Sequence, residues 1–308
     1  MGLRNAIEGK HDQMSEPSSH LPIGVKGQNK NWPRAHPYSM VHLTEHETAR
    51  NKISSDHEIK DYQMNQCFPN VGPLPEIDTK AMIEVDRLMM EDYQISLFQM
   101  MENAGRCLAI LARDIVLGDA PENKRVVVLA GAGGNGGGAL TAARRLATWG
   151  AKICVITAQG RDKMADVPKA QLDILLRLEN VVEMTIEEID VPVDVILDGL
   201  IGYSLTGAPR GQAATLIAWA NENPAPTLAL DVPSGYDAHT GTIAEPAIQA
   251  TATLTIALPK LGMQSEGNAQ HIGSLYCADI SVPPELYHSL TPSLDIGFVF
   301  KNSDIVRL

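Results

Sequence analysis

The chain is predicted to adopt an α/β fold of three layers, with a mainly parallel sheet covered by helices on both faces. Short apolar runs rich in Val, Ile and Leu alternate with longer amphipathic segments, in units of about 30 residues. Aromatic residues make up only 5% of the chain, so its apolar content comes mainly from the aliphatic residues of buried parallel strands. Strands that alternate with helices in this way are joined by crossovers and lie parallel to one another.

The elements follow one another from residue 82 onward. Apolar residues repeat at helical spacing from Met82 to Met89 and from Leu97 to Leu111, which predicts a long helical region. This alternation of elements is Rossmann-like and brings the carboxyl ends of the strands to one edge of the sheet. Strands are expected at 125–130 (RVVVLA), 152–157 (KICVIT), 193–198 (VDVILD), 227–231 (TLALD), 252–258 and 272–278, and helices at 136–149, 162–178 and 212–221.

The composition of the chain changes near residue 75. Residues 1–70 contain six of the nine histidines, and eight Lys and Arg balance eight Asp and Glu there. This stretch is rich in Pro, Ser, Asn and Gln and has no periodicity, so we expect a poorly ordered extension at 1–75. The spacing of its histidines matches no known set of metal ligands. The folded domain is expected at 76–290, and a C-terminal tail at 291–308.

Charge and cysteine usage argue against several classes of protein. The net charge of −12 argues against nucleic acid or an anionic membrane as the main partner. No apolar run approaches the ~20 residues of a membrane span, and the amino terminus lacks the apolar segment of a secretory signal. The four cysteines form no CxxC pair, which favours thiols in a reducing compartment over disulfides or zinc. We therefore expect a cytoplasmic protein with no nucleic-acid or membrane partner.

A glycine-rich segment, 131–138 (GAGGNGGG), follows the first strand. Six glycines in eight residues exceed what a tight turn needs, and glycine permits positive φ and close approach of a ligand. Backbone N–H groups here, with the positive end of the next helix, would cradle phosphates. The segment fits the GxGxxG pattern of dinucleotide-binding proteins, but the second strand ends without the acidic residue that binds the ribose. No Lys-Ser/Thr follows the glycines either, so the Walker pattern fails.

Two aspartates close apolar strands beside this segment. Asp198 precedes Gly199, and Asp231 begins the turn DVPSG, which also carries Ser234. An aspartate at a strand end is often only a cap. Two of them at one sheet edge also suit a general acid/base or oxygen ligands for a hard cation. Lys260 follows a later strand and would either contact ligand phosphates or lie in a solvated or salt-bridged position.

Five blocks of the chain, in order, are similar to motifs of the YjeF N-terminal domain family, the NAD(P)H-hydrate epimerases. The resemblance covers about residues 78–285. In that family Asn and Asp usually stand where this chain has Gly134 and Gly138. The blocks are 99–106 (QMMENAGR, similar to LMENAG), 131–140 (GAGGNGGGAL, similar to GPGNNGGDGL), 193–202 (VDVILDGLIG, similar to VDALFG), 231–241 (DVPSGYDAHTG, similar to DIPSGLDADTG) and 255–262 (TIALPKLG, similar to TFGALKPG).

The resemblance implies interconversion of the R and S forms of hydrated NADH and NADPH, called NAD(P)HX. Asp231 would contact the hydrated ring and act as acid/base catalyst. Asn135, Asp198 and Ser234 would hold one potassium ion per subunit. A separate dehydratase would act in the same pathway, and a homodimer is possible. Substrate-binding residues would be Gly134, Asn135, Gly136, Gly137, Gly138, Gly202, Tyr203, Ser204, Leu205, Thr206, Gly207, Ala208 and Asp231.

Two alternatives stay open from the sequence. One is a catalytically weak nucleotide-binding or scaffold module, since relatives of this fold serve in RNA-decapping assemblies and in lipoprotein-associated partner binding. The other is an enzyme that acts on a different nucleotide-like substrate. Convergence of Asp231, Asp198 and Asn135 on one pocket would favour the epimerase.

Overall fold

The computed structural model describes residues 67–308, so the extension expected at 1–75 lies almost wholly outside the described residues. Its last residues, 67–75, are packed onto the fold. Phe68 is buried and makes an edge contact with Tyr276, with ring centroids 5.7 Å apart. The backbone of Arg307 bonds to Pro69 and Val71 at 2.9 and 3.0 Å. These residues therefore belong to the sheet edge.

The helices and strands alternate as the sequence predicts. The helices are α2 (Thr79–Arg87), α3 (Leu97–Leu111), α4 (Gly134–Thr148), α5 (Asp166–Leu175), α6 (Gln212–Glu222), α7 (Ala269–Ile272) and α8 (Pro284–His288). The strands are β1 (Arg125–Ala130), β2 (Lys152–Thr157), β3 (Val181–Glu183), β4 (Val195–Gly199), β5 (Thr227–Leu230), β6 (Tyr236–Asp237), β7 (Thr242–Ile243), β8 (Ala252–Ile256), β9 (Ser274–Ala278) and β10 (Ile305–Arg307).

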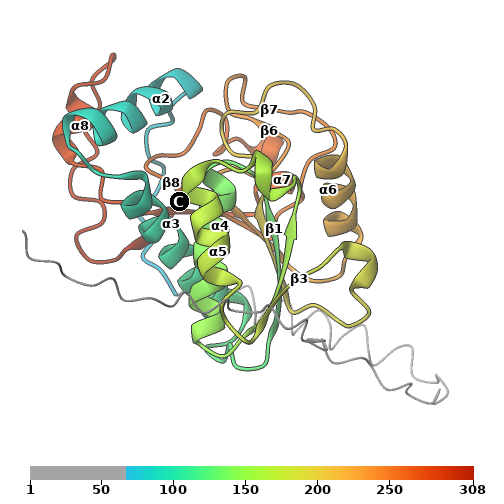
Figure 1. Ribbon diagram of the computed structural model, residues 1–308. Coiled ribbons are helices and arrows are strands. Elements are labelled where there is room, and N and C mark those ends of the chain that lie inside the picture. Colours follow the sequence, from blue (N-terminus) through green and yellow to red (C-terminus); the bar gives the residue numbers. More distant parts are fainter. Residues whose placement is uncertain (1–66) are drawn as a thin grey trace, which may run out of the picture. The chain divides into compact units, whose positions relative to one another are not determined.

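The main sheet of the described residues has eight strands in the order β10-β9-β8-β5-β4-β1-β2-β3 (Figure 1). All neighbours run parallel except β10, which pairs antiparallel with β9. The chain runs from β1 to β2 and β3 on one side, and then returns to place β4 on the other side of β1. The strand order therefore reverses between β1 and β4, which is where ligands bind in open α/β sheets.

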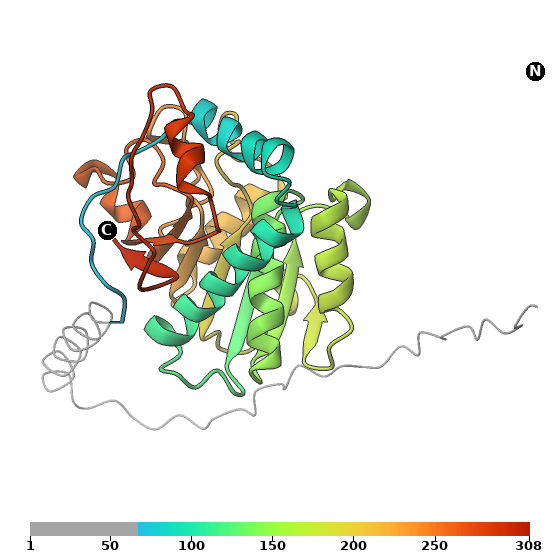
Figure 2. The ribbon, with the colours of Figure 1, turned by 90° about the vertical axis from the view of Figure 1, so that its left-hand side faces the viewer.

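Alternate residues of each strand face opposite layers. On β1, Val126 and Val128 pack in the apolar core that includes α3, α4 and α5, whereas Val127 and Leu129 pack with Leu216 and other residues of α6. Figure 2 looks onto the first layer, where α3, α4 and α5 lie side by side, and Figure 1 shows α6 on the opposite face. Because both faces are covered, the strands are apolar throughout. The three-layer α/β fold is confirmed.

Some elements differ from the expectation. The helical region near 82–111 divides into α2, a π-helical turn over Leu88–Asp92, and α3, which begins after Ser96. The side chains of Ser96 and Gln99 form a reciprocal capping box that starts the new helix. The segment 291–308, expected as a tail, ends in β10, with Ile305 and Val306 buried. Strand β3 and the short hairpin of β6 and β7 were not expected.

Several of the glycines at 131–138 are required by close packing within the fold. None of them has a φ in the left-handed region, and the helix α4 already begins at Gly134. Three of them are buried inside α4 because neighbours approach closely. A Cβ on Gly136 would overlap the carbonyl oxygen of Gly131, and one on Gly137 would lie 2.5 Å from Met101 Sδ. Close packing within the fold therefore explains part of the glycine count.

We expect Gly136→Ala to lower the free energy of unfolding by about 3 kcal/mol, because the added methyl group meets backbone atoms that cannot rotate away. Gly134→Ala is the matched control, since its Cβ would have only Met101 Cε within 4.0 Å. Urea unfolding of both variants measures the effect. Equal stability of the two variants would show that the close approach of Gly131 and Gly136 does not matter.

Candidate active site

A cavity of about 490 Å³ opens at the carboxyl ends of β1, β4 and β5, at the reversal of strand order. Its walls combine apolar side chains of α3 with the start of α4 and with the loops that follow β4 and β5. Predicted substrate-binding residues that line it are Gly134, Asn135, Gly138, Gly202, Tyr203, Ser204 and Asp231. The sequence thus located the site at the correct edge of the sheet.

The other predicted substrate-binding residues lie elsewhere. Leu205, Thr206 and Ala208 line an adjoining hollow of about 390 Å³ beside Gln159 and Arg210, near the end of β2. Gly136 and Gly137 are buried within α4 and line neither space, and Gly207 is exposed without lining either. The segment 131–138 therefore presents Ala132, Gly133, Gly134, Asn135 and Gly138 to the cavity.

The start of α4 is suited to an anion. The first N–H groups of a helix have no intrahelical acceptor, and the N-cap residue Gly133 has no side chain to bind them. Gly133, Gly134 and Asn135 line the cavity, so these donors and the positive end of the helix dipole lie at its wall. Such an arrangement is suited to a phosphate even without a lysine.

Asp231 lies at the end of β5 in a strained conformation. Its φ is +67°, in the left-handed region that non-glycine residues rarely adopt, and its side chain is only 1% exposed. Its backbone N–H donates to Leu254 O at 2.8 Å, which holds the turn against β8. Strain of this kind costs about 1–3 kcal/mol and clusters at functional sites.

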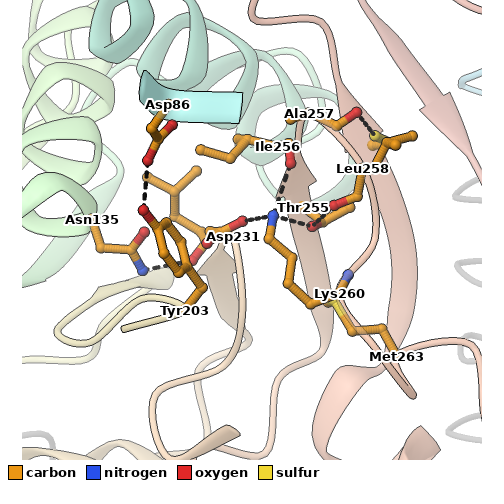
Figure 3. A network of polar contacts seen from close by, with 12 residues as sticks. Asp86, Asn135, Tyr203, Asp231, Thr255, Ile256, Ala257, Leu258, Lys260 and Met263 are labelled. Atoms are coloured by element: carbon orange, nitrogen blue, oxygen red, sulfur yellow. Dashed lines mark hydrogen bonds and ion pairs between the residues drawn. The ribbon is translucent and has the colours of Figure 1, made fainter. Parts of the chain in front are cut away.

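Lys260 forms a buried ion pair with Asp231. The lysine is fully buried, and its Nζ donates to Asp231 Oδ1, to Ile256 O at 2.8 Å and to Thr255 Oγ1 at 3.2 Å (Figure 3). All three ammonium hydrogens therefore have acceptors. From the sequence, Lys260 was expected either to contact ligand phosphates or to be solvated or salt-bridged. The structure shows a buried salt bridge.

Asp198 and Ser234 lie together behind the cavity wall. Asp198 is fully buried, and its carboxylate accepts from Ser234 Oγ at 2.6 Å, Ser234 N at 2.8 Å and Leu200 N at 3.1 Å. Burial raises the pKa of Asp198 to about 6, although these hydrogen bonds lower it. Among the described residues no Lys, Arg or His forms an ion pair with Asp198, so its negative charge lacks a counter-charge.

Asn135 joins this group to the cavity. Its Nδ2 donates to Leu230 O at 2.8 Å and to Ile201 O at 3.3 Å, and Ser234 Oγ also bonds Ile201 O at 3.3 Å. The three predicted metal ligands are thus brought together around the carbonyl of Ile201. Each of the three side chains has an oxygen atom that can serve as a metal ligand. Among the described residues, no group of three or more His, Cys, Asp or Glu could hold a metal ion. These ligands fit a hard cation and do not fit zinc.

Asp86 and Tyr203 form a second polar pair that lines the cavity. Tyr203 donates its phenolic O–H to Asp86 Oδ2 at 2.5 Å, which joins the loop after β4 to α2. Both side chains are half-buried and line the cavity. Tyr203 was predicted from the sequence and Asp86 was not. Nothing in the helical repeat of α2 distinguishes Asp86 from the other charged residues of that helix. Its partner is 117 residues away in the chain.

The fold and this site define an α/β protein that binds a nucleotide-like ligand at the reversal of strand order. The chain belongs to the family described as YjeF-related protein N-terminus, whose model matches residues 97–262. The resemblance found in the sequence is therefore confirmed.

Relatives of the chain agree with this assignment. It is 40% identical to an NAD(P)H-hydrate epimerase of Dehalogenimonas lykanthroporepellens, over 68% of this chain and 84% of the relative. It is 32% identical to the enzyme of that name from Rhodopirellula baltica, over 72% and 91%. The bifunctional NAD(P)H-hydrate repair enzyme Nnr of Salinibacter ruber is 33% identical, and the match covers 41% of that longer protein.

A solved structure supports the fold. The crystal structure of yeast ynu0, YNL200c, aligns with a TM-score of 0.63 at 24% identity, over 76% of this chain and all of the yeast chain. Within residues 67–308, none of the helices is both long and apolar enough to span a bilayer.

Proposed function

We propose that this chain is an NAD(P)H-hydrate epimerase that interconverts the R and S forms of NAD(P)HX. The observation that carries the proposal is Asp231, a buried carboxylate in a strained backbone position at the wall of a cavity that also holds the first turn of α4. The match to the family model, residues 97–262, includes most of the residues that line this cavity. The convergence of Asn135 and Asp231 on the cavity, with Asp198 directly behind it, favours an enzyme over a scaffold.

The chemistry of the substrate suits these groups. Hydration of a dihydronicotinamide ring places a hydroxyl group on the carbon next to the ring nitrogen, so the reacting carbon carries both an oxygen and a nitrogen. Inversion at such a carbon requires that a proton leave the hydroxyl group and later return to it. Asp231 acts as the base for this proton, and the N–H groups at the start of α4 hold the pyrophosphate.

The test is an activity assay. The purified chain, incubated with R-NADHX and a dehydratase specific for the S form in potassium buffer, is expected to accelerate recovery of NADH. A recovery rate equal to that of the spontaneous reaction would refute the function. The same assay with R-NADPHX shows whether both cofactors are accepted.

A potassium ion at Asn135, Asp198 and Ser234 is part of this proposal. The uncompensated charge of the buried Asp198 and the all-oxygen donor set support it. Such an ion would add positive charge near the pyrophosphate and fix the loops after β4 and β5. It would also explain why a carboxylate is kept in a buried position that has no lysine or arginine.

We expect wild-type protein to be more stable in potassium chloride than in choline chloride of the same ionic strength. The gain is roughly 1–3 kcal/mol for potassium at ten to a hundred times its dissociation constant. Asp198→Asn should abolish the difference, because the amide carries no charge to attract the ion. Asp190→Ala, at an exposed position before the start of β4, is the control and should retain it. A potassium effect of equal size in Asp198→Asn would remove this residue from the site.

The chain would act with a separate NAD(P)HX dehydratase, as the two activities of the bifunctional Nnr relatives suggest. We further propose a cytoplasmic location and a homodimer. The thiols of Cys107, Cys154 and Cys277 support a reducing compartment, since all three are buried and burial raises the pKa of each to about 12.

A further inference from the structure

The cavity has ionisable side chains on two sides. Its lining includes the carboxyl groups of Asp86 and Asp231 and the phenol of Tyr203, which are acid/base groups, and the hydroxyl of Ser204. Asp231 comes from the end of β5, and the hydrogen-bonded pair of Asp86 and Tyr203 comes from α2 and the loop after β4. Figure 3 shows both pairs, Asp86–Tyr203 and Asp231–Lys260, in the same part of the site. The proposed function uses only Asp231.

The Asp86–Tyr203 pair differs from an ordinary surface hydrogen bond. Arg87, the next residue, forms ion pairs with Glu84, Glu91 and Asp92, so Asp86 is bonded to Tyr203 without a cationic partner. Burial is the largest cause that raises the pKa of Asp86, and the charge of Asp231 raises it further. Burial and the Asp86 carboxyl also raise the pKa of Tyr203 well above its usual range. Both groups therefore bind their protons more tightly than the same groups would in water.

Epimerisation needs a second proton-carrying group. When the bond between the hydrated carbon and the ring nitrogen breaks, its electron pair goes to the nitrogen, which must receive a proton. The hydroxyl oxygen at the same time loses a proton and becomes an aldehyde oxygen. Rotation about the adjacent carbon–carbon bond and attack of the nitrogen on the other face reverse both transfers. Asp231 serves the oxygen, and the nitrogen needs its own donor.

We propose that Tyr203 is a second catalytic residue, which donates its phenolic proton to the ring nitrogen as the carbon–nitrogen bond breaks and takes it back when the ring closes. Asp86 is the positioning residue: the step requires its protonated form, which holds the phenolic oxygen across the same 2.5 Å contact and passes its own proton to Tyr203 while the nitrogen holds the phenolic one. No oxidant, reductant or further reactant is consumed, since each proton returns to its origin. This inference rests on the proposed function.

The experiment compares Tyr203→Phe, Asp86→Asn and the double variant with wild type, using R-NADHX and the coupled dehydratase. Each single variant is expected to lower kcat by roughly 10²-fold or more, with KM within about threefold, because general acid catalysis contributes 10²–10⁴-fold. The double variant should be no slower than the slower single variant, since the two residues act as one unit. Tyr93→Phe, an exposed tyrosine near the end of α2, is the control and should match wild type.

Asp86→Asn distinguishes a role of Asp86 in proton transfer from a structural role in joining α2 to the loop after β4. The amide oxygen can still accept the Tyr203 hydrogen bond, so the link between α2 and the loop is kept while the transferable proton is lost. Full activity of Asp86→Asn, a kcat of Tyr203→Phe within twofold of wild type, or a loss confined to KM would each overturn the inference. If Asp86→Asn fails to fold, as seen by circular dichroism, the nearly isosteric Tyr203→Phe decides. An inactive wild type would instead refute the proposed function, and this inference with it.

Discussion

Asp231→Asn is expected to lower kcat for epimerisation by about 10³-fold or more while KM changes little. The amide has nearly the shape of the carboxylate, and asparagine tolerates the left-handed φ of +67°. It cannot accept the hydroxyl proton, however, and loss of a general base costs roughly 10²–10⁴-fold. The first turn of α4 is untouched, so the phosphates of the substrate still bind. Steady-state kinetics with R-NADHX and excess dehydratase measure both constants.

The same substitution leaves the buried ammonium of Lys260 without its carboxylate, so a control for folding is needed. The double variant Asp231→Asn, Lys260→Met removes both charges and should melt at a higher temperature than Asp231→Asn alone. It should be equally inactive. Turnover by Asp231→Asn within tenfold of wild type, or recovery of activity in the double variant, would contradict the role of Asp231 as a base.

The strands of the sheet could be predicted where the chain itself marks their ends. The runs at Arg125–Ala130 and Lys152–Thr157 begin at a basic residue and stop at a small or polar one, and both agree with the structure. Strand β3 has only three residues and β10 likewise, which is too short for a period to be recognised. β10 forms because β9 offers a free edge, and this information lies in a distant part of the chain.

The same distinction applies to the site. Asp198 and Asp231 could be predicted because each closes an apolar strand, and topology alone brings such ends to one edge. Asp86 and the pairing of Lys260 could not, since their partners lie 117 and 29 residues away and only the folded chain brings them together. The packing role of the glycines could not be predicted for a related reason. Their count is visible in the sequence, but the packing of Gly136 against Gly131 is visible only in three dimensions.

Lys260→Met is expected to lower the free energy of unfolding by about 3–5 kcal/mol, the usual cost of removing one partner from a buried ion pair. The methionine fills a similar volume, so the loss reflects the charge of Asp231, which is left buried without its ammonium. The acceptors Thr255 Oγ1 and Ile256 O also lose their donor. The variant has two routes to relieve this cost, unfolding or protonation of Asp231, and the second also removes the base that epimerisation needs.

The chain contains a matched comparison for this effect. Lys124 pairs with Asp194 at 3.6 Å, but both side chains are more than a third exposed. Lys124→Met should therefore cost no more than about 1 kcal/mol, as surface ion pairs do. Urea unfolding of the two variants isolates the contribution of burial, since the residue change is identical. If both variants lost the same small free energy of unfolding, the ion pair with Lys260 would not stabilise the buried Asp231. A large loss in Lys260→Met alone means that the lysine is what allows a carboxylate to stand ionised in the cavity wall.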